Sequence, residues 1–361
     1  MKKKTYDADP IPSQLTHDQY KYGTLDMAYY YPLPQLKDSL LNINDFMRWI
    51  ASNNDATYLD AGDGAKEKFY PTNRIRIPVN KENALKTGLV AQKDADKMVD
   101  YIDITIDDRG LSKARLIMLD ILNNFNWKRP IYFTGGANAD EEYIWLKDYL
   151  QLDGMAYKLV PIKTSNKGRT IFDMGRIDPE KMYDNVKKWD WKTINNGEIY
   201  LDEQSKRNAI SLRNNLIRLS EEFLQKGDSV KAKDVLDLSL HKMPIKDFDH
   251  YNFSLGYPEL YYRIGDINKA RETAETLADI FQQKLKYYST FNTQDIDLII
   301  DNLETSLYMY QNLVQQITRY DKDEEYSKKF FEDYITHARL FSHLMPEDEP
   351  ELPQELDTIK P

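Results

Sequence analysis

The order of hydrophobic and polar positions changes character near the middle of the chain. In the first half, alternation with a period of two predicts short strands at 74–79 and 102–106. Residues 94–101 and 112–124 instead have the spacing of amphipathic helices, and Ser112 is suited to cap the second of them. Strands that alternate with helices predict an α/β fold with a mixed or partly parallel sheet.

One stretch of this half predicts a strand, a helix and a further strand in succession. Residues 127–133 read as a loop that enters a buried strand, residues 140–151 as a helix with acidic residues in its first turn, and residues 156–162 as the second strand. This order is typical of a βαβ unit, which would make part of the sheet parallel. The first 35 residues are rich in proline and predict an extended arm.

From residue 204 onward the pattern is that of long helices, and it contains a repeat. The segment Gly227-Asp-Ser-Val-Lys-Ala-Lys-Asp234 recurs as Gly265-Asp-Ile-Asn-Lys-Ala-Arg-Glu272. A glycine that ends one helix, followed by an amphipathic helix, is typical of tetratricopeptide-like hairpins, whose usual period is about 34 residues. We therefore expect stacked all-α hairpins that bury a shared core and offer a concave face to a partner.

The change of pattern divides the chain into four parts. We expect an α/β region at 1–175, a connector at 176–203, helical hairpins at 204–345 and a flexible acidic tail at 346–361. Whether the α/β region is complete at its N-terminal side stays open.

Composition removes several classes of function. The 361 residues carry a formal net charge of −10, which disfavours binding to nucleic acid because phosphates need clustered Lys and Arg. There is no cysteine, so thiol chemistry is excluded, and the five histidines form no tight ligand pair. No apolar run reaches the roughly 20 residues of a membrane helix, and the basic start lacks the apolar core of a signal peptide.

Two loops resemble ligand sites only in part. Residues 134–139 follow a strand and precede a helix, where α/β proteins bind phosphates, but the acidic residues 140–142 would repel an anion. Residues 60–64 suggest a calcium loop, but Pro71 stands where its bidentate glutamate should be, so a tight turn is favoured. We expect neither a cofactor nor a metal, and no catalytic residue stands out.

Aromatic residues are the remaining candidates for contact with a ligand. The chain has 26 tyrosines, and such rings line sugar and peptide sites as well as cores. Packing in the core or between domains is the alternative interpretation. The candidate contacts with a ligand or partner are Trp127, Arg129, Tyr132, Trp189, Trp191, Tyr261 and Tyr262.

Several long blocks of the chain resemble one protein family. They occur in the same order over most of its length, and they include Asn73-Arg-Ile-Arg-Ile-Pro-Val79, Trp127-Lys-Arg-Pro-Ile-Tyr-Phe133, Tyr149-Leu-Gln-Leu-Asp-Gly-Met-Ala-Tyr-Lys-Leu-Val-Pro-Ile162 and Arg213-Asn-Asn215. These blocks are similar to the soluble C-terminal region of the large DUF2723 membrane proteins of Bacteroidota, which resemble GT-C-type glycosyltransferases and protein O-mannosyltransferases.

The resemblance implies a function that the residues alone do not. It implies an accessory domain on the periplasmic face of the inner membrane that positions an acceptor protein or contacts its own upstream membrane domain. In that family the catalytic acidic residue lies in the membrane domain, so no catalytic position is carried over to this sequence. A scaffold module that binds an envelope protein without glycosyl transfer is the alternative, and a free-standing glycan-active enzyme is a third.

Overall fold

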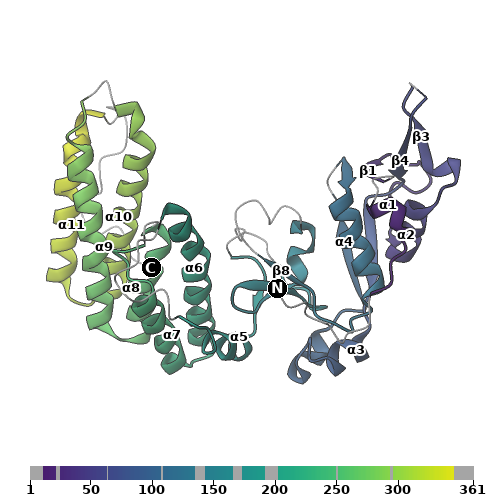
Figure 1. The fold of residues 1–361 in the computed structure, drawn as a ribbon. Coiled ribbons are helices and arrows are strands. Elements are labelled where there is room, and N and C mark those ends of the chain that lie inside the picture. The colour runs from purple at the N-terminus through teal and green to yellow at the C-terminus, as the bar shows by residue number, and fades with distance from the viewer. Residues whose placement is uncertain are drawn as a thin grey trace. The chain divides into compact units, whose positions relative to one another are not determined.

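The computed structural model describes residues 11–21, 25–62, 64–106, 109–134, 143–165, 173–191, 202–248, 251–292 and 296–344 (Figure 1). The chain forms two compact units, an N-terminal unit of residues 1–186 and a C-terminal unit of residues 187–361. The division lies inside the stretch 176–203 for which a connector is predicted. The predicted acidic tail lies outside the described residues.

The N-terminal unit combines short strands with helices, as the α/β pattern predicts. Its α-helices are α1 (His17–Lys21), α2 (Ile43–Ala51), α3 (Lys81–Lys86), α4 (Lys113–Asn124) and α5 (Pro179–Val186), with 3₁₀ helices η1 (Asp55–Thr57), η2 (Gln92–Lys97) and η4 (Ile144–Tyr149). Its strands are β1 (Met27–Tyr30), β2 (Leu41–Asn42), β3 (Tyr58–Asp60), β4 (Lys66–Tyr70), β5 (Arg74–Pro78), β6 (Tyr101–Thr105), β7 (Gly110–Ser112), β8 (Tyr132–Thr134), β9 (Leu150–Leu152), β10 (Ala156–Leu159) and β11 (Arg176–Ile177).

The strands form three small mixed sheets, with the orders β3-β4-β1-β7, β11-β9-β10-β8 and β2-β5-β6. The pairs β1–β4, β9–β11 and β2–β5 are parallel, so the prediction of partly parallel sheets is confirmed. β1 lies inside the first sheet, although the sequence suggested only an extended arm before residue 35.

The predicted βαβ unit is wrong in its central element. Residues 144–149 form the short η4 and residues 150–152 form β9, so the described part of the predicted helix contains a strand. β10 pairs antiparallel with both β8 and β9. A turn at 153–155, with Gly154 at φ +116°, joins β9 to β10, and such a tight connection can only make an antiparallel pair.

Local signals place α4 well, but the helix predicted at 94–101 is wrong, because the 3₁₀ helix η2 ends at residue 97 and β6 begins at residue 101. Ser112 caps α4 by accepting a hydrogen bond from the amide of Arg115, as its position in the sequence predicts. α2 is capped by Asn42, whose side chain accepts a hydrogen bond from the amide of Asn44. Phe46, Met47 and Ile50 on α2 are fully buried and form part of the core.

The C-terminal unit is built from helices in the part that the structure describes. Its first helices are α6 (Glu203–Gln225), α8 (Gly256–Ile264) and α10 (Ile300–Tyr320), and the helices that pair with them are α7 (Ser229–Lys242), α9 (Ile267–Tyr288) and α11 (Glu324–Ala338). The unit also contains the short 3₁₀ helices η6 (Tyr251–Ser254), η7 (Ile296–Leu298) and η8 (Arg339–Leu344). One continuous hydrophobic core runs from Leu236 on α7 to Phe341 on η8.

The repeat in the sequence marks the helix starts. Asp228 and Asp266, which occupy the same place in the two copies, are the N-caps of α7 and α9. Asp323 is likewise the N-cap of α11, although the repeat found in the sequence covers only the segments that begin α7 and α9. Gly265 ends α8 at φ +90°, a left-handed conformation that glycine adopts without strain.

Candidate functional site

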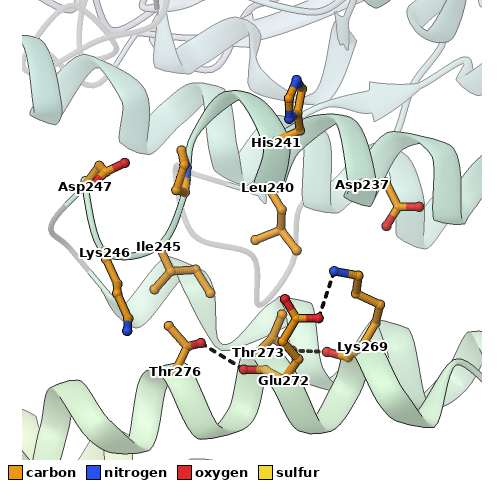
Figure 2. Close-up of a pocket in the computed structure, with 11 residues that line it drawn as sticks. Asp237, Leu240, His241, Ile245, Lys246, Asp247, Lys269, Glu272, Thr273 and Thr276 are labelled. Carbon is orange, nitrogen blue, oxygen red and sulfur yellow. Dashed lines mark hydrogen bonds and ion pairs between the residues drawn. The ribbon is translucent and has the colours of Figure 1, made fainter. Parts of the chain in front are cut away.

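A groove lies between α7 and α9 in the C-terminal unit (Figure 2). Its volume is about 580 Å³, enough for a short extended segment of polypeptide. One wall comes from α7 and the loop that follows it, and the other comes from α9. The lining residues are Asp237, Leu240, His241, Pro244, Ile245, Lys246, Asp247, Lys269, Glu272, Thr273 and Thr276.

Polar side chains on the α9 wall of the groove bond to groups of the same helix. The Nζ of Lys269 lies 2.8 Å from a carboxylate oxygen of Glu272, and the hydroxyl of Thr276 donates to the backbone carbonyl of Glu272 at 2.9 Å (Figure 2). On the opposite wall, the side chains of Lys246 and Asp247 make no hydrogen bond or ion pair with any described residue. These two groups are therefore available to a bound molecule.

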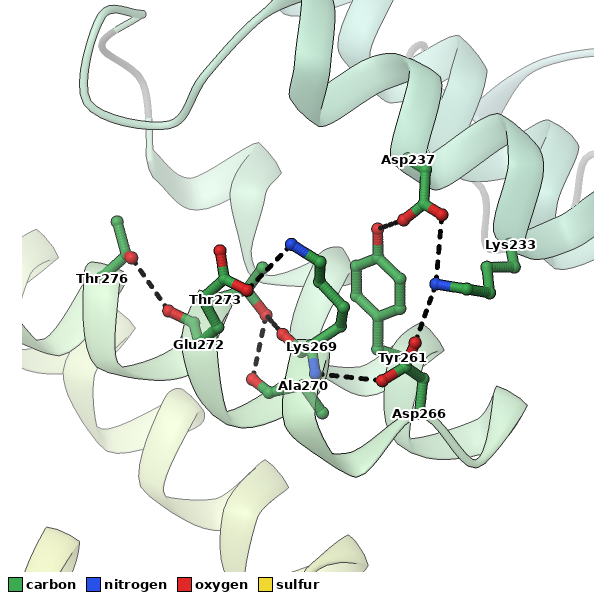
Figure 3. Close-up of polar contacts among 9 residues, drawn as sticks. All are labelled: Lys233, Asp237, Tyr261, Asp266, Lys269, Ala270, Glu272, Thr273 and Thr276. Atoms are coloured by element: carbon green, nitrogen blue, oxygen red, sulfur yellow. Dashed lines mark hydrogen bonds and ion pairs between the residues drawn. The ribbon is translucent and has the colours of Figure 1, made fainter.

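A network of charged residues closes one side of the groove (Figure 3). Lys233 on α7 lies 2.7 Å from Asp266 and 3.1 Å from Asp237, and the phenol of Tyr261 donates to Asp237 at 2.6 Å. Burial and this hydrogen bond raise the pKa of Tyr261, and the hydrogen bond with Lys233 lowers the pKa of Asp266. The network ties the first hairpin to the second and fixes the separation of the two groove walls.

A second network of the same kind joins the second hairpin to the third. The Nε and one terminal nitrogen of Arg271 donate to the two carboxylate oxygens of Asp321, at 2.8 and 2.7 Å. The phenol of Tyr262 donates to Asp321 at 2.7 Å. Burial alone would raise the pKa of Asp321, but the hydrogen bonds from Arg271 and Tyr262 prevail and lower it to about 2. A bidentate arginine–carboxylate pair of this kind is among the stronger polar contacts in proteins.

The depressed pKa of Asp321 predicts acid sensitivity. Because the folded state binds this proton less tightly than the unfolded state, the stabilisation is complete above the unfolded pKa of about 3.9 and is lost as the pH falls toward 2. We expect Asp321→Asn to lower the free energy of unfolding of the C-terminal unit at pH 7 by about 2 kcal/mol, with the gap to wild type closing between pH about 4 and 2. Urea unfolding of both proteins, from pH 7 down to pH about 2, measures the loss of stability and its dependence on pH.

Glu203→Gln is the matched control for this prediction. Glu203 also lies in the C-terminal unit and contacts Lys206 at 3.4 Å, but its side chain is 71% exposed. Exposed pairs contribute about 0–1 kcal/mol, so little change is expected at any pH. A gap between Asp321→Asn and wild type that stays constant down to pH about 2 would contradict the assigned role of the carboxylate.

Arg213 on α6 organises the loop that forms one lip of the groove. Its guanidinium is buried and donates to Ser254 Oγ at 2.9 Å and to the carbonyls of Met243 and Phe248 at 3.2 and 3.4 Å. Its Nε has no partner among the described residues. The carbonyls belong to both ends of the 243–248 segment, so this side chain helps to hold Lys246 and Asp247 in position.

The N-terminal unit holds three of the predicted contact residues, and they do not form a common surface. Trp127 is 1% exposed, its ring packs on Phe125 at 4.8 Å and its Nε1 donates to the carbonyl of Pro78 at 2.9 Å. Arg129 is exposed. Tyr132 is half exposed and donates to Asp153 at 3.3 Å, and burial of its hydroxyl raises its pKa to about 12.

Asp153 also makes a buried ion pair with Lys158 at 2.9 Å, and the amide of Gln151 donates to it at 2.7 Å. Every charge in this cluster is compensated within the sheet of β9, β10 and β8. Such an arrangement is typical of a structural contact and not of a site that waits for a ligand.

The C-terminal unit holds the other four predicted contact residues. Trp189 and Trp191 are partly buried, and their rings lie 5.5 Å apart. Tyr261 and Tyr262 are buried, and each phenol serves one of the two inter-hairpin networks. None of the four lines the groove, and of these only Tyr261 bears on it, through the contact with Asp237 that joins the first two hairpins.

The groove residues themselves were not identified from the sequence. Lys246 and Asp247 lie in an ordinary polar stretch, and only the stacking of two hairpins brings them opposite Lys269 and Thr276. The sequence did point to Arg213, which contacts the loop that carries Lys246 and Asp247. Arg213 belongs to one of the blocks on which the family resemblance rests. A cationic residue inside an amphipathic helix, among apolar positions, is unusual unless it is buried with partners.

The metal, calcium and phosphate sites weighed from the sequence are not supported by the described part of the chain. No group of three or more His, Asp or Glu residues there could hold a metal ion. Asp60 lies at the turn between β3 and β4, where its side chain accepts a bond from the amide of Gly62, as expected of a tight turn. Of the loop 134–139, which was weighed as a phosphate site, residues 135–139 lie outside the described residues. What the groove offers is noncovalent binding through paired charges and apolar side chains.

The comparisons with known proteins give one match. A family model described as TMEM260-associated domain 2 matches residues 1–181. No curated protein and no solved structure shows significant similarity to the chain. Among the helices that the structure describes, none combines the length and the apolar character needed to cross a lipid bilayer.

Proposed function

The chain belongs to the family of TMEM260-associated domain 2, which is linked to membrane glycosyltransferase-like proteins, and from this premise we propose that it is an accessory region of such a membrane protein. Its task is to hold a protein acceptor near a catalytic domain that lies elsewhere. The finer assignments belong to the same proposal: a DUF2723-type protein of Bacteroidota, tetratricopeptide-like hairpins, and a place on the periplasmic face of the inner membrane.

The observation that carries this proposal is the groove between α7 and α9. Stacked helical hairpins bind extended peptides along the surfaces between their helices, because such surfaces are long and lined by side chains from several elements. Here Leu240 and Ile245 offer apolar contacts, while Lys246 and Asp247 offer one charge of each sign. A bound segment would therefore be extended and would carry both an apolar and a charged side chain.

The test uses crosslinking in the intact membrane protein. Photoreactive benzoylphenylalanine at Leu240 lies in the groove, and the same group at Val230 lies on the same helix, 79% exposed and outside the groove. We expect crosslinks to glycosylated proteins from position 240 and none from position 230. Equal crosslinking from both positions, or none from either, would contradict the proposal.

A substitution that fills the groove gives the functional readout. Thr276→Trp places an indole between the two walls, and Val230→Trp is its control on the exposed side of α7. We expect Thr276→Trp to reduce glycosyl transfer to protein acceptors about tenfold, which corresponds to about 1.4 kcal/mol of acceptor binding. Unchanged transfer, with one unglycosylated protein crosslinked at position 240, would instead favour a scaffold that binds an envelope protein.

A further inference from the structure

The three helices α7, α9 and α11 carry the same pattern of side chains, counted from their N-cap aspartates. The fifth position after the cap is a cation and the ninth is a carboxylate. The cations are Lys233, Arg271 and Lys328, and the carboxylates are Asp237, Glu275 and Glu332. Because residues three and four apart share one face of a helix, the fifth, eighth, ninth and twelfth positions form a single surface.

In α7 and α9 this surface contacts the hairpin that follows in the chain. Lys233 lies 2.7 Å from Asp266, the N-cap of the next second helix, and Arg271 lies 3.2 Å from Asp323, the N-cap of the one after. Each carboxylate accepts a hydrogen bond from a tyrosine of the following hairpin. Tyr261 donates to Asp237 at 2.6 Å, and Tyr326 donates to Glu275 at 3.2 Å.

In α11 the same surface has no following hairpin within the described residues. Lys328 contacts only Glu332, at 3.8 Å, and the two side chains are 68% and 65% exposed. They line a shallow depression of about 510 Å³ together with Asp323, Tyr326 and Lys329. α11 lies at one edge of the C-terminal unit (Figure 1). The cation is therefore placed as in α7 and α9, but no N-cap aspartate faces it.

The eighth and twelfth positions of this surface carry apolar side chains in both α9 and α11. In α9 the eighth and twelfth positions are Ala274 and Ala278, at 0% and 3% exposure beneath the third hairpin. In α11 they are Phe331 and Ile335, which are larger and only partly buried. Both side chains pack against the core of the unit and keep part of their surface exposed.

We propose that this face of α11, defined by Lys328, Phe331, Glu332 and Ile335, is a docking surface for a helical hairpin of a partner protein. The partner's second helix begins with an aspartate or glutamate N-cap that pairs with Lys328, and its first helix covers Phe331 and Ile335. The contact continues the interface that already joins the three hairpins. Apolar burial supplies the affinity, and the ion pair selects the partner and its orientation.

A second copy of the chain is a poorer occupant. It would have to offer the opposite edge of the stack, formed by α6 and α7. There Leu216, Leu219 and Phe223 are fully buried, and among the described residues Val230 is the large apolar side chain that is exposed, so this edge offers little apolar surface to Phe331 and Ile335.

The test uses the full chain and a defined probe. The probe is a synthetic peptide of residues 256–288, which make the α8–α9 hairpin that occupies the equivalent seat on α7, crosslinked between its two helices so that it is folded before binding. Circular dichroism verifies its helicity, and fluorescence anisotropy measures its binding. We expect saturable binding that Lys328→Glu weakens about tenfold and that an Asp266→Lys probe restores to the Lys328→Glu chain.

Lys322→Glu is the control, since Lys322 is an exposed lysine just before α11 and outside the docking surface. Lys328 is exposed, so its reversal should leave the fold intact. Failure of the folded probe to bind, or equal binding to the wild-type and Lys328→Glu chains, overturns the proposal. Sedimentation that shows self-association lost in Lys328→Glu also overturns it, because the face would then belong to a second copy.

Discussion

Replacement of Trp127 by alanine is expected to unfold much of the N-terminal unit. The indole is 1% exposed and packs on Phe125, and its Nε1 bond to the carbonyl of Pro78 joins the end of α4 to β5. Loss of a buried tryptophan costs about 3–5 kcal/mol, a large share of the stability of a domain of this size. Urea denaturation with hydrogen exchange of α4 and β5 amides measures the loss.

Two further substitutions separate the causes. Trp127→Phe keeps most of the apolar volume but leaves the Pro78 carbonyl without its donor, so we expect a smaller loss of about 1–2 kcal/mol. Tyr101→Ala removes an aromatic ring that is 48% exposed in the same unit, and we expect little change. If Trp127→Ala left hydrogen exchange unchanged, the ring would not be a core residue and its assignment as a ligand contact would regain support.

Trp127 also shows how far the sequence could guide the interpretation. An aromatic residue in a polar loop, between Asn126 and Lys128, suits a ligand contact as well as a core position. The structure places Asn126 and Trp127 at φ 46° and 57°, in the left-handed region that non-glycine residues rarely adopt. That turn directs the ring back into the core. No pattern of hydrophobicity reports a backbone conformation that is imposed by distant packing.

The elements that were predicted correctly are those whose signals are local. α4 has a capping serine and a helical apolar stripe, and β5 and β6 alternate along their length and pair with each other. By contrast, β9 is buried on both faces and shows no alternation, so it was taken as part of a helix. A short, fully buried strand is identified by its partners β10 and β11, which lie elsewhere in the chain.

In the candidate site, too, the sequence predicted the local features and missed those that depend on distant contacts. The repeat correctly located Asp228 and Asp266 as the starts of two helices, since a cap is a local feature. The groove arises only when α7 and α9 are stacked at the distance that Lys233 and Tyr261 fix. Tyr261 and Tyr262 were candidates because they are adjacent aromatics. Their phenols instead donate to Asp237 and Asp321. The first contact lies beside the groove, and the second joins the next two hairpins.

Replacement of Arg213 by methionine is expected to have the largest effect in the C-terminal unit. Methionine fills a similar volume but donates no hydrogen bond, so the Met243 and Phe248 carbonyls and the Ser254 hydroxyl lose their buried donor. Each unsatisfied buried group costs about 1–3 kcal/mol, partly offset because a buried cation without a carboxylate among these partners is itself unfavourable. We expect a net loss of about 3 kcal/mol in urea denaturation.

The same substitution connects stability with binding. The 243–248 segment carries Lys246 and Asp247, so its amides should exchange faster in Arg213→Met even where the rest of the unit stays folded. Arg207→Met, a replacement of an exposed arginine on the same helix, should change neither stability nor exchange. Arg213→Lys should not rescue, because an ammonium cannot span acceptors that a planar guanidinium reaches from two nitrogens. Rescue by lysine would mean that charge alone, and not the shape of the donor, holds the lip of the groove in place.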